Sequence, residues 1–366
     1  MIQIDFDRLR VLGLRPALAQ LAANFPQADD LQSVDDLHLM RLTEVHRETV
    51  RVHDGEHEHS VRVLPRLMRE LQGADTALAV GDWVLCGTDA FGECRVHARV
   101  PPQSSICRRD ADGRRHAVVS NVDTALLVMG LDDDFNPRRL ERYLALVQAS
   151  GVLPVVMLTK ADVAVRTPGL IEARIEALRR RVPAQVELLA VDGTDPATAQ
   201  RLLKWLAPGQ TVVVLGSSGA GKSTLTNNLL GRTVQDTGAV RAHDSRGKHT
   251  TTSRSLHRLP GGACVIDTPG LRTLRPDADE ATLAAVFEDV DRLAAQCRFR
   301  DCRHVEEPGC AVRAGVEPDR LRNFHKLLRE ARRDTLTVLE GQQQAALWKQ
   351  RGKAQRARAK FERGQE

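Results

Sequence analysis

A glycine-rich loop that ends in lysine and serine carries the clearest chemistry in the sequence. It matches the pattern G-x-x-x-x-G-K-[ST] and consists of Gly216, Ser217, Ser218, Gly219, Ala220, Gly221, Lys222 and Ser223. An apolar run at 211–215 precedes it and a predicted helix at 223–230 follows it, which is the setting of a phosphate-binding loop. The backbone N–H groups of such a loop and the helix N-terminus face the anion. We therefore expect Lys222 to reach the β- and γ-phosphates, Ser223 to bind Mg²⁺, and Thr224 to line the same nucleotide site.

A carboxylate ends the next apolar strand along the chain. The run at 263–267 closes on Asp267, and Thr268, Pro269 and Gly270 follow it. In this D-x-x-G pattern the aspartate suits a Mg²⁺ ligand acting through water, and the Gly270 N–H suits the γ-phosphate. The pattern alone is common, and its position one strand after a phosphate loop makes it informative.

An upstream strand ends in a turn that resembles the guanine-recognition motif N-K-x-D of GTPases. Its residues are Thr159, Lys160, Ala161 and Asp162. The Asp162 carboxylate would accept hydrogen bonds from guanine N1–H and N2–H₂, and adenine offers no such donor pair. The Lys160 stem would pack over the base. Thr159 stands where the motif has Asn, so the contact that links the base turn to the phosphate loop is left open. The alternative is a surface turn.

The order of the three motifs differs from that of ordinary GTPases, in which the guanine motif comes last. Here Asp162 precedes Lys222, which precedes Asp267. A sheet keeps its strands when a chain is cut in one surface loop and joined at another. We therefore predict a circularly permuted GTPase, in which the D-x-x-G segment leads directly into the C-terminal region.

The segment between the phosphate loop and D-x-x-G contains the candidate switch residues. It includes His249, Thr250 and Thr251. Either threonine could complete the Mg²⁺ shell, and the residues alone leave the choice open. Leu271 lies where many GTPases place a glutamine that orients water. Leucine cannot do so, and His249 is the nearest candidate by sequence for the catalytic role, with an exposed loop histidine as the alternative.

Three cysteines and one histidine gather within fourteen residues as C-x4-C-x-H-x5-C. They are Cys297, Cys302, His304 and Cys310. Three thiolates and one imidazole form a closed tetrahedral structural zinc site, whereas a catalytic site would keep an open position. The alternative is a chance grouping of free thiols. The other four of the seven cysteines are expected to be buried apolar fillers on strands.

Two kinds of strand pattern surround these motifs. Short strands at 45–53, 80–85 and 93–100 indicate a small barrel, of which the OB-fold is one type, with Arg95, His97 and Arg99 on a basic outer face. A polar linker is predicted at 101–121. Continuous apolar runs at 124–129, 153–158, 186–191 and 211–215 alternate with helical segments, which is typical of a parallel sheet covered on both faces. After residue 275 the pattern is helical.

Composition and charge limit the remaining classes. The chain is 42% hydrophobic and 28% charged, which excludes collagen-like and largely disordered proteins. No stretch matches a membrane span, and the acidic N-terminus does not resemble a signal peptide, so we expect a cytoplasmic protein without a membrane partner. The tail at 342–366 carries the whole formal net charge of +5, which suggests a polyanionic partner or, alternatively, a solvated terminus.

Together these residues resemble the ribosome small subunit-dependent GTPase A family over nearly the whole chain. The resemblance rests on the permuted order, the segment at 247–252 and the spacing of the cysteine–histidine cluster. It implies an α/β multidomain protein with an OB-fold and N-terminal extension at 1–113, a permuted GTPase domain at 114–275, and a helical zinc-binding domain with the basic tail at 276–366. It also implies GTP hydrolysis to GDP in late maturation of the small ribosomal subunit, rRNA binding, one Zn²⁺ per chain and Mg²⁺ with GTP. His249 matches the family's switch histidine.

Two other functions remain compatible with the residues. One is a zinc-dependent, nucleic-acid-binding NTPase that acts on a non-ribosomal polyanion. Nucleotide competition at Asp162 and co-sedimentation with small subunits distinguish it from the ribosomal GTPase. The other is a non-enzymatic nucleic-acid binder with a vestigial phosphate loop, which phosphate release would exclude. We expect the protein to act as a monomer.

Overall fold

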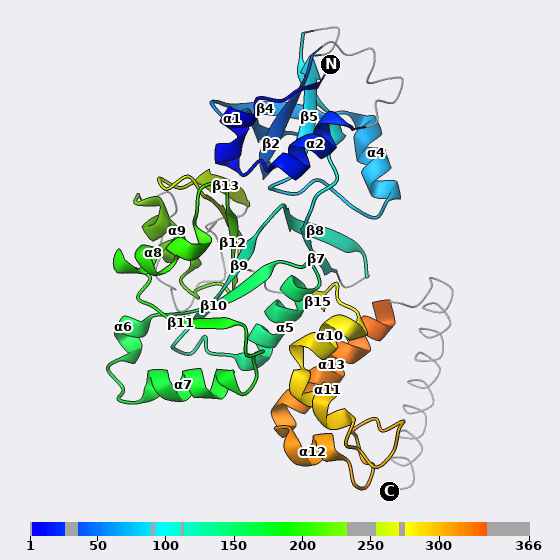
Figure 1. Ribbon diagram of the computed structural model, residues 1–366, viewed down its shortest axis with the longest axis vertical. Helices are drawn as coiled ribbons and strands as arrows, with labels where there is room; N and C mark the ends of the chain where they lie inside the picture. The colour runs from blue at the N-terminus through cyan, green and yellow to red at the C-terminus, as the bar shows by residue number, and fades with distance from the viewer. Residues whose placement is uncertain are drawn as a thin grey trace, which may run out of the picture.

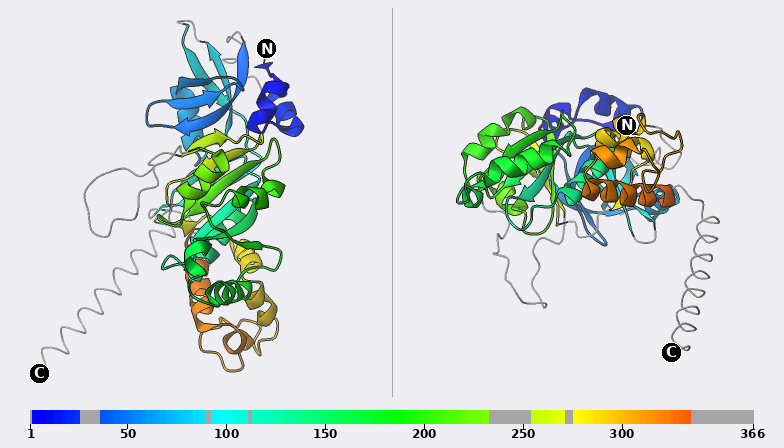
Figure 2. Two further views of the ribbon diagram at one scale, coloured as in Figure 1. Left: turned by 90° about the vertical axis from the view of Figure 1, so that its left-hand side faces the viewer. Right: turned by 90° about the horizontal axis from the view of Figure 1, so that it is seen from below.

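The computed structural model describes residues 2–25, 36–88, 92–110, 113–232, 254–270 and 275–334 (Figures 1 and 2). Along its long axis a β-barrel, a sheet flanked by helices and a helical region follow one another, in that order. Within the described residues no helix has the length and apolarity needed to cross a bilayer.

The barrel is closed by five strands in the order β2-β3-β4-β6-β5, with β5 pairing back onto β2. The strands are β2 (Leu37–Val45), β3 (Val50–His53), β4 (Glu58–Val63), β5 (Trp83–Thr88) and β6 (Cys94–Arg99). Only β4 and β6 pair in parallel, and the helix α4 (Pro65–Gly73) connects β4 to β5. This is an OB-like barrel, as the short strands predicted.

The N-terminal residues pack on the outer face of β2 and β5. β1 (Ile2–Gln3) pairs in parallel with β2, and α1 (Phe6–Leu9), the 3₁₀ turn η1 (Arg10–Leu12) and α2 (Pro16–Ala23) follow. Their apolar side chains share a buried cluster with β2 and β5. The N-terminal helices therefore bury the outward-facing apolar side chains Leu37, Leu39, Trp83 and Leu85 of these strands.

One barrel residue contradicts the predicted basic outer face. Val96 and Ala98 of β6 are both buried, but a bulge places them in different clusters, Val96 with the barrel interior and Ala98 with the N-terminal helices. The Arg99 side chain is only 7% exposed and lies against the fully buried Asp82. Its guanidinium contacts both carboxylate oxygens at 2.9 Å. Arg99 therefore neutralises a buried carboxylate where the barrel meets the next part of the chain, and it is not available to an external anion.

The central sheet has the strand order β11-β10-β9-β12-β14-β13. Its strands are β9 (Thr124–Gly130), β10 (Leu153–Thr159), β11 (Glu187–Ala190), β12 (Thr211–Gly216), β13 (Ser255–Arg258) and β14 (Cys264–Asp267). All pairings are parallel except that of β13 with β14. The chain builds one half of the sheet first and then returns to its middle with β12, so the permuted order predicted from the motifs is present in the strands.

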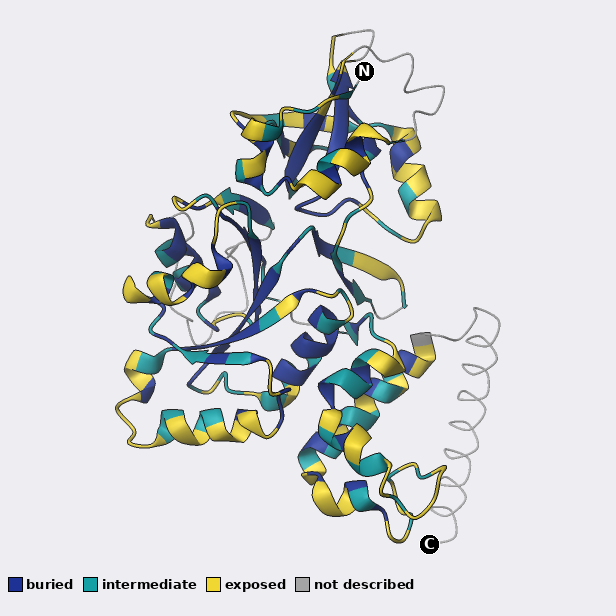
Figure 3. Ribbon diagram, viewed as in Figure 1, coloured by how far each residue is buried: buried dark blue, intermediate teal, exposed yellow. Residues whose placement is uncertain are grey.

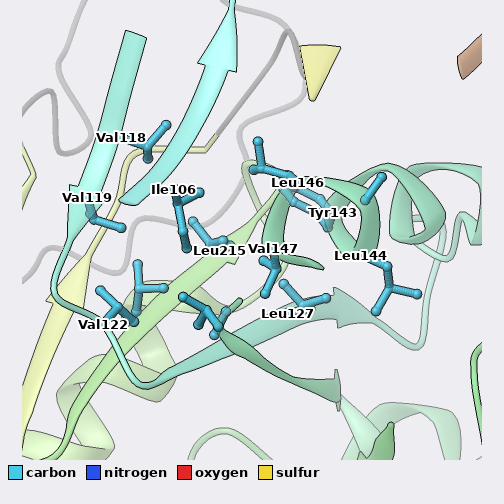
Figure 4. Packing of buried hydrophobic residues seen from close by; sticks show 14 of the residues in the cluster. Ile106, Val118, Val119, Val122, Leu127, Tyr143, Leu144, Leu146, Val147 and Leu215 are labelled. Atoms are coloured by element: carbon cyan, nitrogen blue, oxygen red, sulfur yellow. The ribbon is translucent and has the colours of Figure 1, made fainter. Parts of the chain in front are cut away.

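Helices cover both faces of this sheet, which explains why its strands are apolar throughout. They are α5 (Pro137–Gln148), α6 (Ala161–Ala164), α7 (Leu170–Arg179), α8 (Ala197–Arg201), the 3₁₀ turn η2 (Leu203–Trp205) and α9 (Lys222–Leu230). Tyr143, Leu144 and Val147 of α5 share a buried cluster with Leu127 of β9 and Leu215 of β12 (Figure 4). Every position of β9, β12 and β14 is buried, and most positions of β2 and β5 are buried too (Figure 3).

Residues 101–121, predicted to be a linker, form a hairpin instead. Its strands are β7 (Ser105–Arg109) and β8 (Arg115–Ser120), and β15 (Arg275–Pro276) adds to β7. Arg109 and Arg115 both pair with Asp277. The polar composition was misleading because these ion pairs join segments far apart in the sequence.

The C-terminal region is helical, as predicted. It consists of α10 (Glu280–Val286), α11 (Glu288–Ala294), α12 (Ala311–Gly315) and α13 (Pro318–Asp334). α10 and α13 pack against α5 (Figure 1). The cysteine–histidine cluster lies between α11 and α12.

Candidate functional site

The phosphate loop leaves the end of β12 and enters α9. Gly219 and Gly221 have φ angles of +81° and +91°, which L side chains rarely adopt. A Cβ atom on Gly216 would lie 2.4 Å from the Val128 carbonyl oxygen of the neighbouring strand. The three glycines thus allow a tight turn directly beside β9, with the N-terminus of α9 facing the loop's interior.

Lys222 points back across this loop. Its Nζ donates a hydrogen bond of 2.7 Å to the Ser217 carbonyl, and the residue is 7% exposed. Burial lowers the pKa of Lys222, and the carboxylates of Asp267 and Asp134 act in the opposite direction. The ammonium group is therefore already placed where the loop would hold an anion. Ser223 and Thr224, in the first turn of α9, are half-buried.

The D-x-x-G segment lies against the phosphate loop. Asp267 ends β14, pairs in register with Val214 of β12, and is 1% exposed. A Cβ atom on Gly270 would lie 2.5 Å from the Ser218 nitrogen, so only glycine allows this approach. The structure thus brings Asp267 and Gly270 to the loop, as their predicted role requires.

Thr159 links the turn at the end of β10 to the phosphate loop. Its hydroxyl donates a hydrogen bond of 2.6 Å to the Ala220 carbonyl, and both residues are buried. Lys160 follows with φ +62°, and the exposed Asp162 lies in the first turn of α6. The connection left open by the missing asparagine is therefore made by a hydroxyl group.

Two aspartates that the sequence analysis did not single out brace this turn and the loop. Asp132 accepts a hydrogen bond of 2.6 Å from Lys160 Nζ, and Asp134 accepts one of 2.6 Å from the Ser217 hydroxyl. Both follow the apolar strand β9. The carboxyl ends of parallel strands meet at one edge of the sheet. Acidic residues directly after an apolar run could therefore have been predicted to lie beside the phosphate loop.

The cysteine–histidine cluster forms a second site, remote in sequence from the loop. The donor atoms of Cys297, Cys302, His304 and Cys310 all lie within 4.8 Å of one another. The Sγ atoms of Cys297 and Cys310 are 3.9 Å apart, and His304 Nδ1 lies 3.6 and 3.5 Å from them. Tetrahedral zinc with ordinary bond lengths places sulfur atoms about 3.8 Å apart and sulfur and nitrogen about 3.6 Å apart. The donor set and its spacing therefore fit a closed four-ligand metal site.

A carboxylate organises the loop that carries two of these ligands. Glu307 accepts hydrogen bonds from the backbone N–H groups of Arg303, Val305 and Glu306 at 2.9–3.1 Å. Hydrogen bonding from its own backbone N–H and from these three N–H groups lowers the pKa of Glu307 to about 2. His304 lies inside this loop with φ +60°, a backbone region uncommon for residues with a side chain.

Comparisons with known proteins decide the family. The model of the RsgA GTPase family matches residues 100–276. A protein of Xanthomonas oryzae pv. oryzae named "Small ribosomal subunit biogenesis GTPase RsgA" is 46% identical over 295 residues, which cover 78% of this chain and 79% of that protein. The chain belongs to the RsgA GTPase family. The same name is given to a Xanthomonas euvesicatoria pv. vesicatoria protein, 47% identical over 271 residues and 72% of each chain.

As a member of the RsgA GTPase family, the protein is a GTP hydrolase. Two crystal structures share its fold. The structure titled YjeQ from Thermotoga maritima has a TM-score of 0.57 and 22% identity, covering 80% of this chain and 98% of that one. The structure titled "YloQ, a circularly permuted GTPase" has a TM-score of 0.54 and 21% identity, covering 86% and 100%. The fold class predicted from the motifs is thereby confirmed.

Several predicted residues of the RsgA GTPase site lie outside the described residues. They are His249, Thr250, Thr251 and Leu271, together with the basic tail at 342–366. Their roles stay predictions.

Proposed function

We propose that the edge of the central sheet where β9, β10, β12 and β14 end is the GTP site. The proposal rests on the observation that the guanine turn and the phosphate loop, far apart in sequence, are joined by the bond from Thr159 to Ala220. The nucleotide-binding residues would be Thr159, Lys160, Ala161, Asp162, Gly216, Ser217, Ser218, Gly219, Ala220, Gly221, Lys222, Ser223, Thr224 and Gly270. Asp162 selects guanine, and the loop and Lys222 hold the phosphates.

Magnesium would be held by Ser223, Asp267 and one of the two switch threonines, Thr250 or Thr251. The ion supplies charge stabilisation to the phosphates during transfer. Asp267 supports this assignment because it is a buried carboxylate on the strand beside β12. It lies near enough to act on the pKa of Lys222, and carboxylate oxygen is a ligand that suits Mg²⁺. His249 would orient the attacking water in place of the missing glutamine.

We propose that the GTPase acts in late maturation of the small ribosomal subunit and contacts its rRNA. The name of the two Xanthomonas relatives states biogenesis of that subunit, and the tail with its +5 charge suits a polyanion. Phosphate contacts release counterions, so neutralising about five phosphates gives a log–log salt slope of about −4. Such a factor would work as a monomer in the cytoplasm, where subunits mature.

The cysteine–histidine cluster would hold one structural Zn²⁺ per chain. Four protein ligands at fitting distances leave no open position, so the metal would fold the loop and take no part in hydrolysis. The corresponding division of the chain is an N-terminal extension and barrel at 1–113, a GTPase domain at 114–275, and a zinc domain with the tail at 276–366.

GTP turnover with and without purified small subunits tests the proposal. We expect stimulation by small subunits and none by large subunits, with GTP but not ATP competing for the site. A Lys222→Ala variant provides the background rate. Turnover that small subunits leave unchanged, or that another polyanion stimulates equally, would refute the ribosomal role. Equal competition by ATP would refute the guanine assignment.

A further inference from the structure

The helix α5 is linked to the phosphate loop through Asp134, which precedes its first turn, and it contacts the C-terminal helices along its side. At its first turn, Arg139 pairs with both the carboxylate and the carbonyl oxygen of Asp134. The same Asp134 carboxylate accepts hydrogen bonds from the Ser217 hydroxyl at 2.6 Å and from the Gly130 N–H at 3.0 Å. Asp134 therefore connects a residue of the phosphate loop to a residue of α5.

Two residues further along, α5 holds the C-terminal helix α13 through buried charges. Glu141 is fully buried and accepts hydrogen bonds from Arg320 at 2.8 Å and from Asn323 at 2.5 Å. Arg320 in turn pairs with Asp289 of α11 at 2.6 Å. Arg142 and Glu330 form a bidentate pair at 2.6 and 2.7 Å. Because buried charged groups tolerate little separation, α11 and α13 must follow any movement of this part of α5.

Arg139, Glu141 and Arg142 lie within about 5 Å of one another along the helix axis, given a rise of 1.5 Å per residue. The other side of α5 packs on β9 and β12 through Tyr143, Leu144 and Val147. Since β12 leads directly into the phosphate loop, the helix rests on the same strand that positions the loop.

Filling the loop changes the charge that faces Asp134. The phosphates of a nucleotide bring several negative charges close to Ser217, and Lys222 would leave the Ser217 carbonyl for them. Repulsion then weakens the contact of Asp134 with the loop and favours its pairing with Arg139. The free energy of nucleotide binding therefore differs between two placements of α5, one with Asp134 bound to the loop and one with Asp134 bound mainly to Arg139. Such a difference is what coupling between sites requires.

We propose that Asp134 is a positioning residue of the phosphate loop, and that its ion pair with Arg139 couples nucleotide binding to the C-terminal helices through α5. The proposal rests on the nucleotide site proposed above. It concerns a route separate from the D-x-x-G segment, because α5 precedes the phosphate loop in the chain and joins α13 through side chains alone.

Hydrogen exchange of the full-length protein, measured with and without saturating GDP, tests this route. The readout is the protection of α11 and α13 peptides, with GDP affinity measured in parallel. In the unmodified protein we expect GDP to change the exchange of α13 by at least threefold. Asp134→Asn keeps the side-chain shape and should abolish most of that change at GDP concentrations that still saturate the site.

Asp133→Asn is the matched control. It removes the same charge from the adjacent residue, which is exposed and makes no hydrogen bond or ion pair with the described residues, so the response of α13 should persist. Arg139→Gln breaks the same link from the helix side and should repeat the effect of Asp134→Asn, which covers the case of one variant folding poorly. A general loss of structure would raise the exchange of α13 already in the absence of GDP, whereas a loss of coupling leaves the GDP-free exchange of α13 close to that of the unmodified protein.

The outcomes separate the two proposals. If GDP does not bind the unmodified protein, the proposed nucleotide site is wrong and this inference falls with it. If GDP binds but α13 exchange does not respond, the site stands and the coupling is refuted. If Asp134→Asn or Arg139→Gln keeps the full response, the route through Asp134 is refuted.

Discussion

Removing the hydroxyl group of Thr159 should weaken guanine nucleotide binding, although this residue does not belong to the phosphate loop. Thr159→Val keeps the shape of the side chain and takes away the donor that the Ala220 carbonyl uses at 2.6 Å. Ala220 is fully buried, so its carbonyl would have no water to replace the lost partner. Leaving such a group unsatisfied costs about 1–3 kcal/mol.

The cost would appear in affinity because the nucleotide-free loop can relax and the bound loop cannot. In the free variant the loop can turn the carbonyl toward water, and binding must then pull it back. If the whole penalty appears on binding, the dissociation constant for GTP rises about 5- to 150-fold. If the loop does not relax, the same penalty appears as a lower free energy of unfolding.

A titration with a fluorescent guanine nucleotide and a urea unfolding curve measure the two quantities. Thr159→Ser keeps the hydroxyl group and should stay close to the unmodified protein in affinity. Thr124→Val is the control for a threonine-to-valine change in the same sheet, since Thr124 is buried but its hydroxyl makes no hydrogen bond with the described residues. Unchanged affinity and unchanged unfolding in Thr159→Val would show that the bond to Ala220 does not hold the loop.

Four further outcomes are expected. Asp162→Asn replaces an acceptor by a donor, so it should weaken GTP binding and relatively favour xanthosine triphosphate in a competition assay. His249→Ala should lower turnover while leaving GTP affinity nearly unchanged, because its proposed role exists only in the transition state; an equal rate would return it to an ordinary loop histidine. Elemental analysis should find one zinc per chain, and Cys310→Ala should lose it and expose the C-terminal region to protease, since metal binding and folding are coupled. Arg99→Met leaves Asp82 buried without its cation, at a cost of about 3–5 kcal/mol in unfolding free energy, and adding Asp82→Asn should recover part of that loss.

Local patterns predicted which segments the fold brings together at the sheet edge better than they predicted the surfaces around them. The phosphate loop, the guanine turn and D-x-x-G each depend on a few consecutive residues that must hold one ligand, so their spacing is visible in one sequence. The hairpin of β7 and β8 was missed because its arginines are neutralised by Asp277, which lies far along the chain. The burial of Arg99 was missed for the same reason, since its partner Asp82 belongs to another element. Ion pairs between residues far apart in the chain produce no periodic pattern in the sequence, so their partners cannot be predicted from local residue patterns.

The permuted strand order has a consequence for how the chain emerges during synthesis. The barrel can close once β6 is complete, because the five strands that close it are near one another in sequence. The central sheet cannot, since β9 lies between β10 and β12, and its second edge waits for a strand that appears only after the four helices α5 to α8 have been made. Until then the nascent chain carries an open, apolar strand edge, which invites pairing with other chains. Slow, non-local pairing of this kind prolongs exposure during folding. We therefore expect fragments that end before β12 to aggregate. We also expect folding of the complete chain to depend on rapid translation of the residues from β12 onward.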